Sequence, residues 1–250
     1  MQIRLNTQDP TGQSRFYRWH YTETWEFNSL HMSVLEYRDG IIKDRITPIY
    51  TCWRTEQTSF IRQASTASLS QDAVSNLPLT SFSDRAERVR VRYSILVSQY
   101  AETAEEFAYL EVLRKNTEAV GTVNDPLPSQ LTGNVHRVGS DTSEPVLGFI
   151  GAHTVQQKRL FLTLQDLGLP YNWPFDSPYA ACTEFNERVP NPDDKPPNII
   201  YIPYTQLFAG PTYVPTYYYV DNGITLGYLG SKRECVDCRV RGTNVKPSFW

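Results

Sequence analysis

The residues from Ser14 to Phe27 alternate in character, reading S-R-F-Y-R-W-H-Y-T-E-T-W-E-F. In an extended chain every second side chain lies on the same face. One face of this segment would then carry aromatic rings and a single carboxylate, at Tyr17, Trp19, Tyr21, Glu23, Trp25 and Phe27. A helix, with a period of about 3.6 residues, would scatter the same side chains. We therefore expect a long β-strand whose aromatic face lies in the core, with Glu23 as the exception on that face.

Similar patterns recur along the chain and predict a series of shorter strands. The predicted strands are Gln2–Asn6, Val34–Arg38, Ile41–Trp53, Arg88–Tyr100, Asn134–Val138, Pro145–Leu164, Asn198–Pro203 and Tyr213–Val220. Asp39-Gly40 and Asp221-Asn222-Gly223 are typical of turns between strands. By contrast, Ser65–Asp84 is rich in Ser, Thr, Asn and Pro, which predicts a loop or a short helical turn.

The strand predicted at Arg88–Tyr100 begins with arginines at alternate positions, so one of its faces is cationic. This pattern has two interpretations. The face is either a solvated surface paired with nearby acids or a row of arginines that binds an anion.

A helical pattern occurs at Thr103–Val120. Thr103 and Glu106 form a capping box, apolar side chains recur at helical spacing from Phe107, and Gly121 follows as a C-terminal cap. The sequence therefore predicts a mainly β fold, with antiparallel sheets arranged as in a β-sandwich, one amphipathic helix at about 103–120 and long Pro-rich loops. The longest such loop is Leu167–Pro197, with a hydrophilic tip at Asn191–Lys195.

The chain has 250 residues, which we expect to form a single β-rich domain over 1–250. It opens directly on a strand pattern without a signal peptide. This favours the C-terminal part of a longer protein, with a complete chain that starts on an edge strand as the alternative. The net charge of −3 indicates no nucleic-acid partner, and no apolar run reaches the roughly 18 residues of a membrane-spanning helix.

Four cysteines are present, at Cys52, Cys182, Cys235 and Cys238. A Cys₄ zinc site normally shows two paired spacings, and a redox Cys-x-x-Cys normally stands before a helix. Neither feature is present, so a structural disulfide is favoured, joining Cys182 to Cys235 or Cys238. Cys52 is then either the partner of another cysteine or a buried free thiol. In the same C-terminal segment, Gly242 would turn the chain and Phe249 and Trp250 would pack. Arg239 and Arg241 would contact acids such as Glu184 or Glu187.

No catalytic motif, cofactor motif or His pair with metal-ligand spacing occurs in the sequence. We therefore predict no enzymatic activity, no cofactor and no metal. Rigid aromatic side chains in exposed segments can still provide a platform for a glycan or a peptide. The candidate ligand-binding residues are Trp173, Tyr213, Tyr217, Tyr218 and Tyr219.

Several segments together resemble one known family. They include Y-R-W-H-Y-T-E-T-W-E-F, R-Y-S-I-L-V-S-Q-Y, D-P-L-P-S-Q-L-T-G-N-V-H, E-P-V-L-G-F-I-G-A and C-V-D-C-R-V-R-G-T-N-V-K-P-S-F-W. They are similar to the domain-of-unknown-function family 4249, predicted outer-membrane lipoproteins of Bacteroidetes. The family's lipoprotein signal, acylated cysteine and N-terminal β domain are not found in this sequence.

The resemblance implies a cell-envelope location, at the outer membrane, the cell surface or in the periplasm. It also implies a gene neighbourhood with TonB-dependent receptors, and it transfers no catalytic residue. We therefore expect a non-enzymatic module that serves as a surface accessory to a TonB-dependent receptor or another outer-membrane protein. Membrane attachment would come only from an N-terminal lipid anchor that this chain lacks. The alternative is a glycan- or peptide-binding protein that uses the exposed tyrosines and Trp173.

Overall fold

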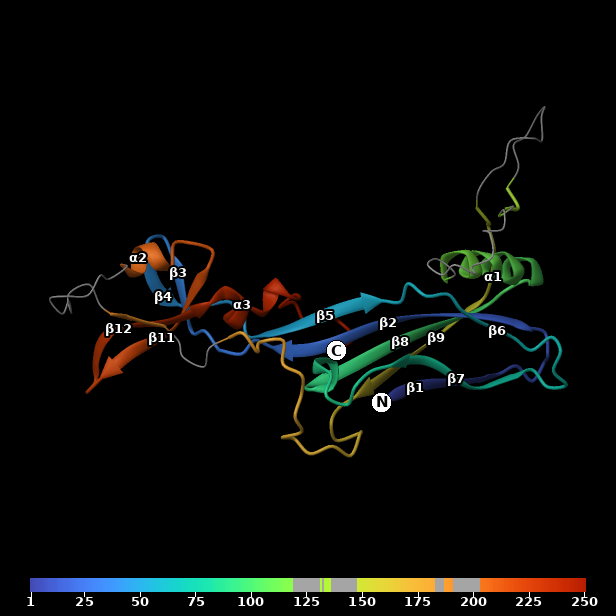
Figure 1. The fold of residues 1–250 in the computed structure, drawn as a ribbon, viewed down its shortest axis with the longest axis horizontal. Coiled ribbons are helices and arrows are strands. Elements are labelled where there is room, and N and C mark those ends of the chain that lie inside the picture. The colour runs from blue at the N-terminus through green and yellow to red at the C-terminus, as the bar shows by residue number, and fades with distance from the viewer. Residues whose placement is uncertain (119–130, 132, 136–147, 183–186, 191–202) are drawn as a thin grey trace, which may run out of the picture. The chain divides into compact units, whose positions relative to one another are not determined.

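Strands dominate the computed structural model, which describes residues 1–118, 131, 133–135, 148–182, 187–190 and 203–250 (Figure 1). Strands hold 41% of the residues and helices 14%, in several antiparallel sheets. The prediction of a mainly β fold is therefore confirmed.

The chain divides into two compact units. Unit 1 consists of Met1–Glu23, Glu56–Ser83 and Ile95–Leu160, and unit 2 of Thr24–Thr55, Asp84–Ser94 and Phe161–Trp250. Several of the unit boundaries fall within strands and not in linkers. The expectation of a single domain over 1–250 stays a prediction.

One sheet has the strand order β5-β2-β8-β9, with β6 paired to β2. Its strands are β2 (Phe16–Asn28), β5 (Thr51–Gln57), β6 (Arg62–Ser65), β8 (Arg92–Ala101) and β9 (Val155–Leu162). The strand predicted at Ser14–Phe27 is β2, and its aromatic face is buried as expected, with Trp19 and Phe27 each 1% exposed. Glu23 is buried with them.

In unit 1, β1 (Gln2–Gln8) and β7 (Ala73–Ser81) form an antiparallel pair. The prediction that Ser65–Asp84 is a loop is therefore wrong. Pro78 and Asn76 misled it, because both residues are typical of turns. A strand that pairs on one side tolerates Pro78, and Asn76 adopts a left-handed φ of 60° near an irregularity in the register.

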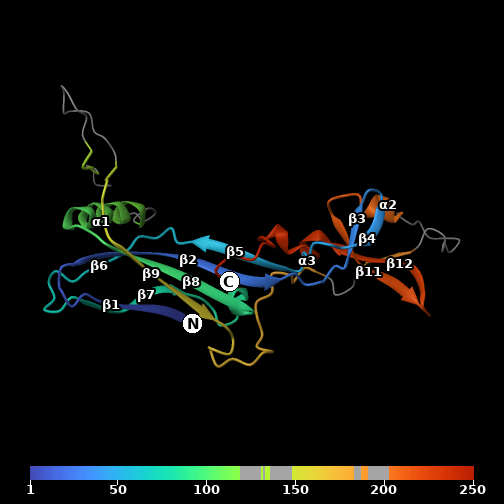
Figure 2. The same cartoon turned by 180° about the vertical axis from the view of Figure 1, so that it is seen from behind.

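The helix α1 (Ala104–Glu118) occupies the predicted helical segment of unit 1. Its first turn is capped by Thr103, whose Oγ1 accepts the amide of Glu106 at 3.1 Å. The Phe107 ring packs on Phe16 of β2, with the ring centroids 5.2 Å apart. Both views show α1 beside the part of β2 that pairs with β6 (Figures 1 and 2). Gly121, the predicted cap at the other end, lies outside the described residues.

Unit 2 holds two smaller sheets, a hairpin β3-β4 and a sheet of order β10-β12-β11. The elements are β3 (Leu35–Arg38), β4 (Ile41–Asp44), β10 (Glu187–Pro190), α2 (Tyr204–Leu207), β11 (Tyr213–Asp221), β12 (Ile224–Lys232) and α3 (Arg233–Val236), with 3₁₀ turns at Glu87–Val89 and Cys238–Val240. Both predicted turns are present. Asp39 and Gly40 join β3 to β4, and Asn222 and Gly223 join β11 to β12, all with positive φ.

Three predicted strands are shorter than expected. The segment Ile41–Trp53 is interrupted between β4 and β5, where Pro48 removes a backbone donor. The segment Arg88–Tyr100 starts with a 3₁₀ turn, and only its later part is β8. Within the described part of Pro145–Leu164 the strand covers β9 alone. Most of Asn134–Val138 and of Asn198–Pro203, and the tip Asn191–Lys195, lie outside the described residues.

Candidate functional site

The four cysteines form two disulfides, both within unit 2. Cys182 bonds Cys235, with the Cα atoms 6.0 Å apart, and Cys52 bonds Cys238, with the Cα atoms 5.7 Å apart. The prediction of structural disulfides is confirmed, and Cys182 takes one of its two possible partners. Cys52, whose state the sequence left open, takes Cys238. Two separate bridges therefore tie the C-terminal segment to earlier parts of the chain.

Further contacts hold this segment in place. The backbones of Trp53 and Thr243 exchange two hydrogen bonds of 2.8 and 2.9 Å. Gly242 is required by a close approach, since a Cβ atom there would lie 2.5 Å from the Trp53 carbonyl oxygen. The Trp250 indole donates to Glu26 Oε2 at 2.9 Å, whereas Phe249 remains 41% exposed. The predicted packing of the C-terminal aromatic residues therefore applies best to Trp250.

Arg239 and Arg241 find different acids from those predicted. Arg239 donates from Nε to Asp237 Oδ1 at 2.8 Å and from Nη2 to Asp237 Oδ2 at 2.8 Å. Arg241 donates from Nη1 to Glu87 Oε1 at 2.8 Å and also contacts the second oxygen of that carboxylate. Of the predicted partners, Glu184 lies outside the described residues. The choice of Glu87 depends on a contact between residues 154 positions apart, which local patterns do not encode.

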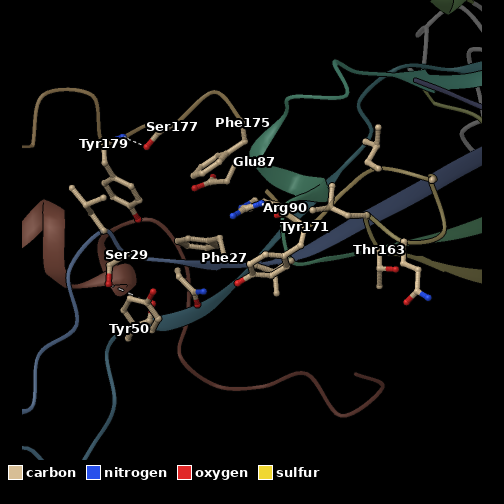
Figure 3. A pocket seen from close by; sticks show the side chains of 17 residues that line it. Phe27, Ser29, Tyr50, Glu87, Arg90, Thr163, Tyr171, Phe175, Ser177 and Tyr179 are labelled. Atoms are coloured by element: carbon tan, nitrogen blue, oxygen red, sulfur yellow. Dashed lines mark hydrogen bonds between the residues drawn. The ribbon is translucent and has the colours of Figure 1, made fainter. Parts of the chain in front are cut away.

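A cavity with a volume of about 880 Å³ lies among the described residues of unit 2 (Figure 3). This volume is in the range of sites for small organic ligands. Its aromatic wall is made by Phe27, Tyr50, Tyr171, Phe175 and Tyr179, and its polar lining includes Asn28, Ser29, Glu87, Arg90, Thr163 and Gln165. The long loop that follows β9 supplies much of one wall.

Arg90 places a guanidinium in the middle of this cavity (Figure 3). The guanidinium carbon lies 5.4 Å from the centroid of the Tyr171 ring and 5.2 Å from that of Phe175. Arg90 Nη1 donates to the carbonyl oxygens of Tyr171 and Trp173. No carboxylate of the described residues forms an ion pair with Arg90. The cavity thus contains a positioned cation without a counter-ion from the described chain.

Glu87 does not supply that counter-ion because it is engaged by Arg241. The guanidinium of Arg241 also lies over the rings of Phe27 and Tyr179, at 4.9 and 5.3 Å from their centroids. These contacts fix one wall of the cavity. The bonds and charge of Glu87 raise the pKa of Arg241 above its usual value, although burial opposes this.

Tyr179 carries an unsatisfied polar atom into the same cavity. The side chain is buried, with 7% exposure, and its hydroxyl meets hydrogen-bond geometry with no described group. Burial raises the pKa of the phenol, and the approach of the Arg241 guanidinium to the hydroxyl partly offsets this effect. Arg241 is thus a neighbour of the hydroxyl, but it makes no hydrogen bond of good geometry with it. A buried hydroxyl without a partner is rare in folded proteins. Together with Arg90, it marks a place where a ligand would complete the polar contacts.

The candidate ligand-binding residues are divided between two places in unit 2. Trp173 lies on the loop that borders the cavity, where its carbonyl accepts from Arg90. The four tyrosines lie on β11, which is an edge strand of its sheet, one of the two alternatives that the sequence favoured. Tyr218 donates to Asp44 and packs near Tyr228, with the ring centroids 5.9 Å apart.

The arginines before and at the start of β8 pack against aromatic rings. Arg88 lies 4.9 Å from the Trp25 centroid, and Arg92 lies 4.4 Å from that of Phe161. Neither interpretation of the alternating arginines anticipated these contacts. The abundance of both arginine and aromatic residues was the available signal, but the sequence does not say which ring each cation meets. For the same reason Arg90 was noticed only as one of the alternating arginines, and Tyr179 was missed as a site residue.

Within the described ranges, no helix is long and apolar enough to cross a membrane. In the same residues, no group of three or more His, Cys, Asp or Glu side chains is placed to hold a metal ion. No curated protein and no solved structure matches the chain.

One family model matches residues 1–159, and it is described as "Domain of unknown function (DUF4249)". The match covers more than half of the 250 residues. The resemblance noted in the segment from Cys235 to Trp250 lies outside the matched residues. On the strength of the match over 1–159, the chain belongs to the DUF4249 family.

Proposed function

We propose that the chain is a non-enzymatic binding module of the cell envelope, and that it binds its ligand in the cavity of unit 2. The observation that carries this proposal is that one aromatic-walled cavity is lined both by Arg90, which has no carboxylate partner, and by the buried Tyr179, whose hydroxyl makes no hydrogen bond of good geometry. A cavity of this kind binds an organic molecule through its apolar body and orients it through few polar groups.

The ligand class follows from the two polar groups. A guanidinium without a carboxylate partner selects an anion, and its planar fork matches a carboxylate. The Tyr179 hydroxyl can donate to a second acceptor of the ligand or accept from an amide of the ligand. The five aromatic rings favour an apolar or aromatic side chain next to the carboxylate. The free C-terminal end of a short peptide has all these features.

The two disulfides support the envelope location. Such bonds persist in oxidising compartments and are rare in the cytosol, where thiols are kept reduced.

The test compares two matched peptides by isothermal titration calorimetry. Acetyl-Leu-Phe with a free carboxylate should bind, and the same dipeptide as its C-terminal amide should bind roughly tenfold or more weakly, because a charge-assisted pair is lost. Arg90→Gln should remove this preference, whereas Arg38→Gln, at an exposed position of β3, should leave it intact. Equal binding of the two peptides by the wild-type protein would contradict the proposal. Binding only of an acidic sugar such as glucuronic acid would replace the peptide by a glycan ligand.

Tyr179→Phe gives a second and independent test. It removes a hydroxyl that has no described partner and keeps the ring. The free protein should therefore be as stable as the wild type or slightly more stable, because an unsatisfied buried group is lost. Binding of the dipeptide should weaken several-fold. A clear loss of stability without any change in affinity would show that the hydroxyl serves the fold and not the ligand.

A second proposal concerns the partner. The chain serves as a surface accessory to an outer-membrane receptor of the TonB-dependent kind, as expected from the family resemblance. It is supported by β11, an edge strand that exposes Tyr217, Tyr218 and Val220. Copurification from native membranes should recover such a receptor with the full-length protein. Recovery of the protein always alone would contradict this proposal, and Val220→Lys should reduce the yield of the receptor.

A further inference from the structure

A second, smaller cavity in unit 2 is bordered by three arginines. Its volume is about 210 Å³, and Arg45, Arg233 and Arg239 line it together with Tyr37, Tyr213 and Asp237. None of these residues lines the larger cavity described above. We propose that this is a binding site for a small tetrahedral oxyanion, a phosphate or a sulfate group.

The charges around the cavity favour an anion. The three guanidinium groups are opposed by the carboxylates of Asp237 and Glu36, which also line it. The carboxylate of Glu36 also forms an ion pair with the exposed Arg38, whose Nη2 lies 3.5 Å from Glu36 Oε1. One positive charge therefore remains on the lining in excess of the two carboxylates. An oxyanion bound against these side chains would neutralise this charge.

Asp237 is fully occupied and does not compete for the remaining donors. Its carboxylate accepts the amide, Nε and Nη2 of Arg239, and Nη1 of Arg233 at 3.3 Å. It is 3% exposed and lies between Cys235 and Cys238, so both disulfides fix its position. Asp237 thus orients two of the arginines and leaves their outer edges to a ligand.

Each arginine keeps one terminal nitrogen without a described partner. Arg45 donates from Nε to Ser33 Oγ at 3.0 Å and from Nη2 to the Leu35 carbonyl, which leaves Nη1. Arg233 uses Nε for the Pro211 carbonyl and Nη1 for Asp237, which leaves Nη2. Arg239 keeps Nη1. Three positioned donors on three guanidinium groups suit an oxyanion, which offers several acceptor oxygens.

The mutual repulsion of these cations is visible at Arg45. Its pKa is lowered, first by burial and also by the positive charges of Arg239 and Arg233. The negative charge of a bound oxyanion would oppose both effects by favouring the charged form of Arg45. The volume of about 210 Å³ corresponds to a few water molecules and so fits a single phosphate or sulfate group, not a peptide. Tyr213, one of the tyrosines singled out in the sequence, borders this cavity and can donate its hydroxyl.

The test measures the affinity for inorganic phosphate and for inorganic sulfate by isothermal titration calorimetry, at constant ionic strength set with chloride. Saturable binding of either anion to the oxidised protein is expected. Arg45→Gln and Arg233→Gln should each weaken it at least tenfold, whereas Arg90→Gln, in the larger cavity, should leave it unchanged. Loss of binding by Arg90→Gln with full binding by the other two variants would overturn the assignment. Absence of saturable binding up to high millimolar anion would also overturn it.

Arg45 is half-buried and supports its neighbours, so Arg45→Gln could simply unfold the site. Arg233→Gln is the safer variant, because the Arg233 side chain is 41% exposed and its replacement should leave the fold intact. Thermal unfolding gives a second readout, since an anion that binds only the folded protein raises the Tm with concentration. The rise should be present in wild type and Arg90→Gln and absent from Arg233→Gln. An equal rise in all three proteins would mean a general salt effect and would overturn the site.

Vesicles that contain phosphatidylglycerol distinguish the two possible sources of the anion. If the vesicles compete with inorganic phosphate for the protein, the ligand is a lipid headgroup. If they do not compete, the ligand is a soluble anion.

Discussion

Several half-buried arginine side chains of unit 2 pack on aromatic rings. Arg92 lies over Phe161, Arg88 over Trp25 and Arg241 over Phe27, at 4.4, 4.9 and 4.9 Å from the ring centroids. A planar guanidinium can stack on a ring and still donate from its edge, which an ammonium group cannot do in the same way. Replacement of these arginines by lysine is therefore not conservative.

Arg241→Lys tests this point. It should lower the free energy of unfolding by about 1–3 kcal/mol, because the forked pairing with Glu87 and the ring contacts are lost together. Chemical denaturation of the oxidised protein measures the effect. Arg4→Lys, on the exposed β1, should change stability by less than about 0.5 kcal/mol. A similar small effect for both variants would show that Arg241 adds little to the fold.

The lowered pKa of Asp237 predicts that the free energy of unfolding decreases in acid. Burial is the largest influence and would raise its pKa, but the hydrogen bonds and charge of Arg239, with the charge of Arg233, bring the pKa below the ordinary 3.8. Because the folded-state pKa is below the unfolded one, the contribution of Asp237 is complete above the unfolded value. It is lost as the pH falls from 3.8 through the folded pKa. Asp237→Asn should flatten the stability profile in this acid range. A profile as steep as that of the wild type would place the acid sensitivity elsewhere.

The residues of the cavity show where sequence reasoning stops. The alternation of Arg88, Arg90 and Arg92 was visible, but their aromatic partners come from segments that lie far along the chain. The missing partner of the Tyr179 hydroxyl is likewise a property of three-dimensional packing and leaves no sequence pattern.

Among the elements, the C-terminal segment depends most on covalent links. The disulfides span 186 and 53 residues. In the chain-entropy model, loops of these lengths correspond to about 5 and 4 kcal/mol. The burial of Ile49, Val214 and Val236 around Cys235 adds a small apolar core.

Removal of each disulfide by paired serine substitutions should therefore destabilise the protein by about 2–5 kcal/mol. Cys52→Ser with Cys238→Ser should cost more than Cys182→Ser with Cys235→Ser, because it opens the longer loop. Thermal or chemical unfolding without reductant measures both. A thiol titration should find four thiols on the reduced wild-type protein and none on the oxidised protein, in agreement with the pairing of all four cysteines. Reversal of the order of the two double variants would show that strain or local packing outweighs loop length.

At the same scale, patterns that depend on local geometry were predicted correctly from the sequence. The aromatic face of β2, the start of α1 at Thr103 and the turns at Gly40 and Gly223 all follow from side-chain periodicity or backbone freedom. The strand β7 was missed because its pairing with β1 overrides the turn preferences of its own residues.

For the whole molecule, the cysteines are distributed unevenly. All four belong to unit 2, and unit 1 contains none. Two boundaries between the units fall at Glu23/Thr24 and Ser94/Ile95, inside β2 and β8. No Pro- or Gly-rich linker marks these positions, which explains why two units were not expected from the sequence.

Reduction should therefore affect the two units differently. Amide hydrogen exchange should accelerate in β11, β12 and α3 of unit 2 after reductant is added, while the pair β1–β7 of unit 1 keeps its protection. Mass spectrometry of peptides from oxidised and reduced protein measures this difference, and the oxidised sample is the reference. Simultaneous loss of protection in β1 and β12 would show that the two units unfold as one.

The pairing of the cysteines also determines the order in which the chain can mature. On export to the proposed envelope location, Cys52 and Cys182 leave the translocation machinery before either native partner, because Cys235 and Cys238 follow them in the chain. Oxidation of cysteines in their order of arrival would join Cys52 to Cys182, which is a non-native bond. Native pairing of Cys52 and of Cys182 thus requires either protection of their thiols until Cys235 and Cys238 arrive or later exchange through a mixed disulfide. Folding by the second route depends on the thiol-isomerase capacity of the compartment that receives the protein.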